Sequence, residues 1–482
     1  MKKMFCALFA GLCLLWAGVA GAEVLRASPD GMSLTEALAL AKDGDRIELA
    51  DGVYTQPAEA FPLTVQRAVT VCAAQEARPV IDAPAFLAAF RVEADGVTFR
   101  GLDVRMRRTG FYALGDDMTV EDCAISLADP EWRTSSCGIW MGGIHRAAVR
   151  GCAFTGCSIA IAGPPLSETS HLVPVLTGLF EVGEDVDFFT SHTISDCTVN
   201  GKPLFYAVNE ERVLAPPDAG QVIIANCAEA VVEEADVSCA SMGMEIAYCG
   251  HVQVTRCRAD DCGVFGIYLA KNQGGDVIDS SCEGTNHGID IRASQEINVI
   301  GCRANACDQG IFFSKVERGL VKDCTVTATG QGYFFAAGSH SQIDGCAAID
   351  CENGLNIQKE DDMLITRCTL RGNSICAARL DGSPTVFSGN TLEDNWVGIM
   401  AYGEVPFMIV DNEVKNSGSC GLYLRDIAYS RISGNTIAES RKSSMQAVGE
   451  MAGTLFTGNR LDRACELSKG AALRDPNSPA ER

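Results

Sequence analysis

The sequence lacks most of the short motifs that mark well-known catalytic and metal sites. Its 23 cysteines include no Cys-x-x-Cys pair, which argues against thioredoxin-like chemistry and clustered thiolate metal sites. Gly-x-Ser-x-Gly, His-Glu-x-x-His and phosphate-loop motifs are also missing, so the enzyme classes that they mark are not indicated. Basic residues are few: 39 Lys and Arg stand against 62 Asp and Glu, a formal net charge of −23. Such a balance disfavours nucleic acids and anionic membranes as partners.

Long apolar stretches are confined to the first 22 residues. Two lysines precede an apolar run that ends in Ala20-Gly21-Ala22, the pattern of a secretory signal with its cleavage site. The run is too short for a stable membrane span, and no later stretch approaches that length. We therefore expect an exported chain, periplasmic or extracellular, that begins near Glu23 and has no transmembrane segment after cleavage.

What the sequence has in abundance is a repeat of 22 or 23 residues between Cys257 and Gly458. Each copy contains two or three short apolar stretches, separated by Gly, Asn, Asp and Ser, which is the chemistry of strands and turns. The Leu residues of a leucine-rich repeat are absent. We therefore expect an all-β fold, a right-handed parallel β-helix in which stacked coils bury a continuous core. One small residue marks the same point in nine copies: Cys257, Ser280, Cys302, Cys324, Cys346, Cys368, Asn390, Asn412 and Asn435.

The domain organisation follows from where this pattern begins, breaks and ends. After the signal peptide, residues 1–22, we expect a single β-helix domain over 23–465 and a disordered tail over 466–482. A capping helix is expected at 33–43, because Ser33 and Glu36 have the spacing of a capping box. Regular coils occupy 254–460, and the irregular coils at 163–220 are expected to carry protruding loops, including one around VNGKPLFY. Loops on regular scaffolds often carry function.

The cysteines are interpreted mainly as packing residues. Cysteines in register on adjacent coils lie about 4.8 Å apart, slightly beyond the Cβ separation of about 3.5–4.5 Å in a disulfide. Removing Cys6 and Cys13 with the signal leaves 21 thiols, an odd number that cannot all pair. Soft donors that suit Cu(I) occur together in one segment, although core packing also explains them: Cys239, Met242, Cys249 and His251.

Two outward-facing columns are predicted by counting two and four residues beyond the glycine of each repeat. The first includes Glu245 and Ala378, and the second includes Leu380. Asp290 and Arg292 would be neighbours there, as candidate catalytic residues: the carboxylate would bind a uronate, through Ca²⁺, and the arginine would take the proton. The alternative is that loops cover this face and its aromatic side chains are merely packed. The candidate ligand-binding face consists of Tyr268, Phe312, Phe334, Gln358, Tyr402, Tyr423 and Arg425.

One segment points to a family. The export signal, the SLTEAL cap, the coils and especially VNGKPLFY followed by PPDAGQVIIANC resemble the NosD-like periplasmic β-helix family. The more specific parts are Asn200–Pro203 and Asp218–Gln221. The resemblance implies an accessory protein on the outer face of the inner membrane, working with an ABC transporter in copper-enzyme maturation.

The sequence therefore favours an exported binding or accessory protein over an enzyme. Two alternatives stay open: a polysaccharide lyase or epimerase that acts on uronate-containing glycans, and a structural cell-surface solenoid. Calcium and copper are both candidate cofactors, and a membrane transporter or a polysaccharide is the candidate partner.

Overall fold

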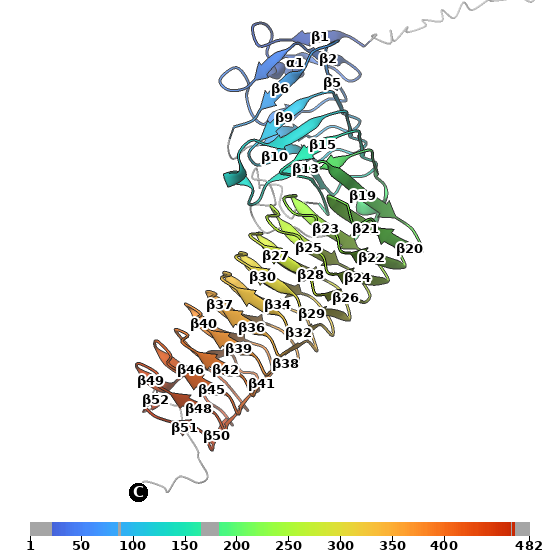
Figure 1. Cartoon of the computed structure of the whole chain (residues 1–482). Helices are drawn as coiled ribbons and strands as arrows, with labels where there is room; N and C mark the ends of the chain where they lie inside the picture. The colour runs from blue at the N-terminus through green and yellow to red at the C-terminus, as the bar shows by residue number, and fades with distance from the viewer. Residues whose placement is uncertain (1–21, 85–87, 165–182, 464, 468–482) are drawn as a thin grey trace, which may run out of the picture.

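The computed structural model describes residues 22–84, 88–164, 183–463 and 465–467. The protein is an all-β parallel solenoid built as two stacks of coils, which meet at an angle near β16 and β19 (Figure 1). Three predicted segments lie wholly or partly outside the described residues: the signal peptide up to residue 21, part of the irregular region at 165–182, and the tail from 468. Among the described residues, no helix has the length and apolarity that crossing a bilayer requires.

The first stack consists of three parallel sheets. Sheet A contains β1 (Val24–Ala27), β2 (Arg46–Leu49), β5 (Thr70–Ala73), β8 (Thr98–Arg100), β11 (Thr119–Glu121), β14 (Ala148–Arg150) and β17 (Thr193–Ser195). Sheet B contains β3 (Gly52–Tyr54), β6 (Pro79–Asp82), β9 (Asp103–Met106), β12 (Ala124–Leu127), β15 (Ala153–Thr155) and β18 (Thr198–Val199). Sheet C contains β4 (Leu63–Val65), β7 (Ala88–Val92), β10 (Thr109–Ala113), β13 (Cys137–Gly142) and β16 (Ile159–Ala162).

The second stack has the regular coils. Sheet D contains β19 (Lys202–Val208), β21 (Gln221–Ala225), β23 (Met242–Ala247), β25 (Phe265–Ala270), β28 (His287–Arg292), β31 (Gln309–Ser314), β34 (Gln331–Ala336), β37 (Asn353–Gln358), β40 (Cys376–Asp381), β43 (Ile399–Tyr402), β46 (Cys420–Arg425), β49 (Ser443–Val448) and β52 (Cys465–Leu467). Sheet E contains β20 (Arg212–Ala215), β22 (Glu229–Glu233), β24 (His251–Thr255), β26 (Gly275–Ile278), β29 (Ile297–Ile300), β32 (Leu320–Lys322), β35 (Gln342–Asp344), β38 (Met363–Thr366), β41 (Thr385–Ser388), β44 (Phe407–Val410), β47 (Arg431–Ser433) and β50 (Leu455–Thr457). Sheet F contains β27 (Ser281–Glu283), β30 (Arg303–Asn305), β33 (Thr325–Thr327), β36 (Ala347–Ile349), β39 (Thr369–Arg371), β42 (Thr391–Glu393), β45 (Glu413–Lys415), β48 (Thr436–Ala438) and β51 (Arg460–Leu461).

Helical structure is limited to short elements. Helix α1 (Leu34–Leu40) is capped by Ser33, whose side chain accepts from the Glu36 backbone N–H while the Glu36 side chain accepts from the Ser33 N–H. This reciprocal pair is a capping box, and α1 buries Leu34 and Ala37 at the N-terminal end of the core. The other two elements are the 3₁₀ turn η1 (Pro130–Trp132) and α2 (Asp187–Thr190).

The repeat residues form ladders inside the second stack. The Cys302 backbone N–H donates to Cys324 Sγ at 3.3 Å. Where asparagine replaces cysteine, the ladder is stronger: Oδ1 of Asn412 accepts from both the backbone N–H and the side chain of Asn390, each at 3.0 Å. All 21 cysteines of the described segments are free thiols, and 19 of these are buried. Cysteine thus acts here as a small buried hydrophobe.

The junction between the stacks differs from the sequence-based expectation. Residues around VNGKPLFY were expected to protrude as a loop, but Lys202–Val208 is β19, which pairs antiparallel with β18 and parallel with β21. Asn200 and Gly201 make the tight turn between β18 and β19, both with positive φ. Apolar and aromatic residues of β19 pack against the core, so the segment is the first strand of the second stack.

The edge of sheet C at β16 is covered by side chains instead of a further strand. Gln221 accepts from the backbone N–H of Ile159 and donates to its carbonyl oxygen. Ser241 Oγ accepts from Ser158 N at 2.8 Å, and Glu245 Oε2 accepts from Ile161 N at 3.2 Å. Polar side chains from the second stack therefore satisfy backbone groups that an open edge would leave unpaired.

Candidate ligand-binding face

The outer surface of sheet D carries two columns of side chains in register. One column runs from Glu245 through Tyr268 and Asp290 to Phe312. Further along, the counted register is wrong by one residue: Arg379 and Asp381 stand in the columns where Ala378 and Leu380 were expected. Ala378 and Leu380 are fully buried in the core. In this coil Ala377 stands where the other coils have glycine, and it comes one residue later than the period predicts. The position could therefore not be counted from a glycine.

Asp290 and Arg292 are neighbours, as expected, but they are locked together. Arg292 Nε donates to Oδ1 at 2.7 Å and Nη2 donates to Oδ2 at 2.9 Å. His287 Nδ1 lies 2.7 Å from Oδ2, and Asp290 is completely buried. Burial alone would raise the pKa of Asp290, but the charge of Arg292 and the hydrogen bonds from His287 and Arg292 outweigh it and lower the pKa. An ionised carboxylate with both oxygens engaged by these groups does not fit a Ca²⁺ ligand or a proton carrier.

Aromatic rings surround the Arg292 guanidinium. Its Cζ lies 5.3 Å from the ring centroid of Phe265, 5.8 Å from that of Tyr268 and 5.2 Å from that of Phe312. Tyr268 is fully buried and Phe312 is 9% exposed, so these two candidate residues are packed side chains instead of an open platform. Such cation–π contacts help to hold the guanidinium in one orientation.

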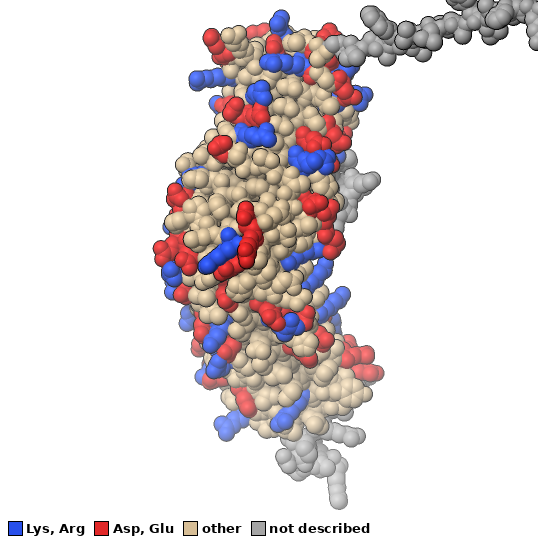
Figure 2. Space-filling model, turned by 90° about the vertical axis from the view of Figure 1, so that its right-hand side faces the viewer, with Lys and Arg blue, Asp and Glu red and all other residues tan. Residues whose placement is uncertain are grey.

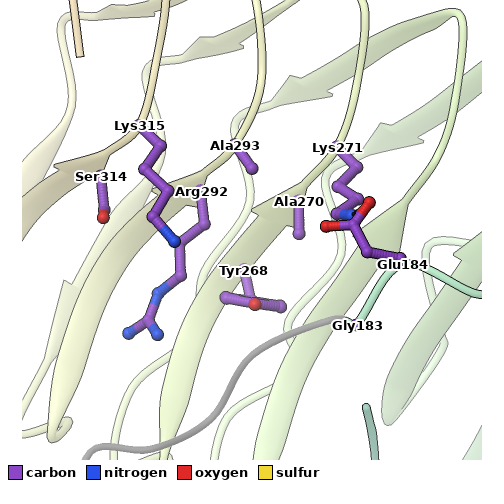
Figure 3. Close-up of a pocket in the computed structure, with 9 residues that line it drawn as sticks. All are labelled: Gly183, Glu184, Tyr268, Ala270, Lys271, Arg292, Ala293, Ser314 and Lys315. Carbon is purple, nitrogen blue, oxygen red and sulfur yellow. Dashed lines mark ion pairs between the residues drawn. The ribbon is translucent and has the colours of Figure 1, made fainter. Parts of the chain in front are cut away.

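A pocket of about 120 Å³ opens beside this cluster (Figure 3). Lys315 and Arg292 lie on one side of it, Lys271 and Glu184 on the other, with Ala270 and Ala293 between them. Among the described residues, its lining includes Lys271, Arg292, Lys315 and the carboxylate of Glu184, and Tyr268 and Ser314 also contribute.

Glu184 forms an ion pair with Lys271 at the edge of the pocket. Its Oε2 lies 2.7 Å from Lys271 Nζ, although the Glu184 side chain is 98% exposed. The hydrogen bond from Lys271 and its charge, with a smaller contribution from Lys315, lower the pKa of Glu184. The preceding residue is anchored independently, because the Tyr248 hydroxyl donates to the Gly183 carbonyl at 2.9 Å.

A second cluster of arginine and tyrosine lies farther along the same face, over β40, β43 and β46. Arg425 Cζ is 4.7 Å and Arg379 Cζ is 5.7 Å from the ring centroid of Tyr402. The rings of Tyr402 and Tyr423 are 5.8 Å apart. These tyrosines are half-buried and Arg425 is exposed, so this part of the face is accessible to a ligand or a partner.

Between the two clusters, Phe334 and Gln358 are half-buried on the face. Gln358 donates to Asn356 Oδ1 at 3.1 Å. The ring of Phe334 packs 5.0 Å from that of Phe312. The seven residues of the candidate face therefore lie on one sheet surface, but those near Asp290 are covered and those near Tyr402 are open.

The soft donors do not come together as a copper site. Met242 and Cys249 are fully buried in the core, whereas His251 is exposed at the start of β24 in sheet E and Cys239 is half-buried in a turn. Within the described ranges, no group of three or more His, Cys, Asp or Glu side chains is arranged to hold a metal ion. Cys239, Cys249 and His251 therefore do not form a shared metal site.

The side of the molecule formed by sheet E has a mixed surface. Figure 2 shows acidic and basic side chains interspersed there with uncharged areas, without a continuous field of one sign.

Sequence reasoning missed Lys271, Lys315 and Glu184. The two lysines occupy the same turn position two coils apart, each with φ of 56°, where a non-glycine residue is uncommon. The repeat period alone places the two lysines at the same position of their coils. It does not place Glu184 beside them, because Glu184 belongs to the irregular region between the stacks.

Comparisons with known proteins agree with this architecture. Residues 301–466 match the family model described as periplasmic copper-binding protein (NosD), and residues 188–348 match the right handed beta helix region. No curated protein matches the chain.

Several solved structures are similar in a looser sense. The periplasmic alginate epimerase AlgG is 10% identical with a TM-score of 0.34, covering 88% of this chain and 85% of that one. The polygalacturonase from Erwinia carotovora is 9% identical with a TM-score of 0.25, covering 93% and 97%. Pectate lyase Pel9A is 14% identical with a TM-score of 0.24, covering 64% and 78%. These values are too low to carry an argument about function. The stacked coils and the match of residues 188–348 show a right-handed β-helix fold, and residues 301–466 are similar to the NosD family model.

Proposed function

We propose that the protein is an exported accessory protein of the NosD kind, which binds a ligand or partner and works with an ABC transporter in the maturation of a periplasmic copper enzyme. The match of residues 301–466 to the NosD model carries this proposal. The locked state of Asp290 supports a binding role over catalysis, because its two oxygens are already engaged by Arg292 and His287.

Copper would be cargo of the maturation system in this proposal. The described residues do not offer a fitting donor set, so no copper-transfer step is assigned to them. The accessible cluster of Tyr402, Tyr423 and Arg425 is the proposed contact face for the partner, since tyrosine and arginine are enriched where interfaces bind most strongly.

The proposal is tested by deleting the gene in the source cell and measuring the copper content and activity of its exported copper enzymes. Both should fall and should return with the wild-type gene. A Tyr423→Ala/Arg425→Ala variant that is exported normally should restore them poorly, whereas Tyr429→Ala, which removes a tyrosine 77% exposed elsewhere, should restore them fully. Unchanged copper loading in the deletion strain would overturn the proposal.

A lyase or epimerase acting on uronate glycans is the second candidate. The observation in its favour is the pocket, where Lys271, Arg292 and Lys315 could neutralise a carboxylate and a lysine could take a proton. Incubation with a panel of uronate polysaccharides, with and without Ca²⁺, should then give the absorbance of an unsaturated product, or an altered uronate composition for an epimerase. If no polymer gives the unsaturated product or an altered uronate composition, the binding role is the better explanation.

A further inference from the structure

The outer surface of sheet E lies on the side of the molecule that faces the viewer in Figure 2. We propose that this surface is the interface of a symmetric dimer, in which a second copy of this chain packs its own sheet E against it and the two solenoid axes run antiparallel. The inference goes beyond the accessory function, which does not require a particular oligomeric state.

One column of outward side chains follows eight successive strands of sheet E, from β26 to β47. The pairing of these strands places the members of the column directly above one another: Asp276, Asn298, Leu320, Gln342, Leu364, Val386, Met408 and Arg431. Leu364, Val386 and Met408 form a continuous apolar stripe within it, and Met408 is 43% exposed. A contiguous apolar stripe on an open surface is typical of a site that binds another protein.

The two ends of this column carry opposite charges. Asp276 accepts a hydrogen bond from Asn298 Nδ2 at 2.8 Å, and Arg431 Nε donates to Ser433 Oγ at 3.0 Å. Both of these contacts are made with neutral side chains, and Arg431 is exposed. Each charge can therefore pair with an opposite charge on a partner.

A two-fold axis parallel to the strands, placed between Gln342 and Leu364, makes the column complementary to itself. The rotation reverses the order of the coils, so the first member of the column faces the eighth and the second faces the seventh. Asp276 of each copy then lies opposite Arg431 of the other copy. A two-fold contact uses the same patch on both copies, and the two opposite-charge pairs fix its register.

The same rotation places apolar side chains opposite apolar side chains. Leu320 faces Val386 in the first column. In the second outward column, two residues further along each strand, Ile300 faces Val410. All four side chains are partly exposed in the single chain, so their contact would remove apolar surface from water and favour association.

The size of the face sets the expected strength of the dimer. Eight strands spaced about 4.8 Å apart, each about 13 Å long, cover roughly 500 Å² on each copy. The total of about 1,000 Å² is near the lower limit of specific interfaces. We therefore expect a dimer that dissociates in the micromolar range of concentrations.

The first test is sedimentation velocity of the purified chain over a series of micromolar concentrations, where wild type should shift from monomer to dimer. Met408→Lys should raise the dissociation constant about tenfold or more, because the lysine charge would lose water among apolar side chains. Ile375→Lys is the matched control: Ile375 is 46% exposed and precedes β40 of sheet D, outside the interface. It should leave the dissociation constant unchanged.

The second test exchanges the two charges. Arg431→Asp and Asp276→Arg should each weaken the dimer, because like charges would then face each other across the interface. The double variant restores opposite charges and should bring the dissociation constant back to within a few-fold of wild type. A monomer at every concentration, equal effects of Met408→Lys and Ile375→Lys, or a double variant as weak as the single ones would overturn the assignment.

Discussion

Gln221 binds the edge strand β16 through both the nitrogen and the oxygen of its side-chain amide. Its Nε2 donates to the Ile159 carbonyl oxygen at 2.6 Å and its Oε1 accepts from the Ile159 N–H at 3.3 Å. Gln221 is the last residue of Asp218–Gln221, one of the two segments on which the sequence-based resemblance to the NosD-like family rests, although the family model itself matches residues 301–466. This segment builds the junction between the two stacks, and the side-chain amide of Gln221 pairs with β16 as the backbone of one further strand would.

Replacing Gln221 should loosen this junction. In Gln221→Ala both backbone groups of Ile159 lose their partners in a fully buried place, at a cost of about 1–3 kcal/mol for each unsatisfied group. Hydrogen exchange followed by mass spectrometry should show faster exchange in peptides that cover 159–162. Gln342→Ala, at an exposed position of sheet E, is the control and should not change it. Equal protection of β16 in wild type and Gln221→Ala would show that the glutamine does not hold the edge.

Glu245 should make stability depend on pH in the direction opposite to that of most carboxylates. It is fully buried, its Oε1 has no hydrogen-bond partner among the described residues, and burial raises its pKa well above the usual value despite the hydrogen bond from Ile161. A carboxyl whose pKa is raised on folding stabilises the fold in its neutral form. That contribution is complete below the unfolded pKa and is lost as pH rises toward the folded one.

Glu245→Gln should therefore match wild type at acidic pH and melt at a higher temperature than wild type at pH 8. Thermal unfolding of both proteins from pH 4 to pH 9 measures the difference. Glu352→Gln, at an exposed position, supplies the comparison. A gap between Glu245→Gln and wild type that stays constant with pH would contradict a buried neutral acid.

Asp290 should matter for stability far more than an accessible aspartate in an equivalent pair. Removing it leaves Arg292, whose side chain is only 14% exposed, without its buried counter-ion, and breaking a buried pair in this way typically costs about 3–5 kcal/mol. Arg379 and Asp381 form the same type of pair on β40, but their side chains are 43% and 42% exposed. Asp381→Ala should therefore cost about 0–1 kcal/mol. Urea unfolding of the two variants compares them directly, and similar losses would refute the structural role of Asp290.

The sequence predicted the coil architecture because a strict period carries it. The 22-residue spacing of the ladder residues fixes which side chains stack, and inward positions such as Ile267, Ile289 and Ile311 follow from alternation within each strand. The family matches confirm the β-helix and the NosD resemblance. Local chemistry also indicated α1, because a capping box needs only Ser33 and Glu36.

Features that depend on contacts between unlike coils could not be predicted. The burial of Tyr268 and Asp290 depends on packing that a single coil does not encode. Glu184, which lines the pocket, pairs with Lys271, 87 positions later in the chain, and the period of the repeat does not predict that contact. At β40 the outward residue was predicted as Ala378 instead of Arg379, because this coil has no glycine at the repeat position. Without that glycine, the sequence does not reveal the additional residue before β40.

The free thiols should divide sharply by accessibility. Of the 21 cysteines in the described part of the chain, 19 are buried, and only Cys239 and Cys465 are partly exposed. Burial also raises the pKa of thiols such as Cys157 and Cys262 to about 12, which removes the reactive thiolate at neutral pH. A chain that begins at Glu23 should thus react at no more than two thiols with Ellman's reagent at pH 8 when native, and at all 21 in denaturant. Cys239→Ser and Cys465→Ser should each remove one native thiol, whereas Cys324→Ser should remove none. Rapid native reaction of many more thiols would show that the ladders open in solution, and a denatured count well below 21 would reveal disulfides.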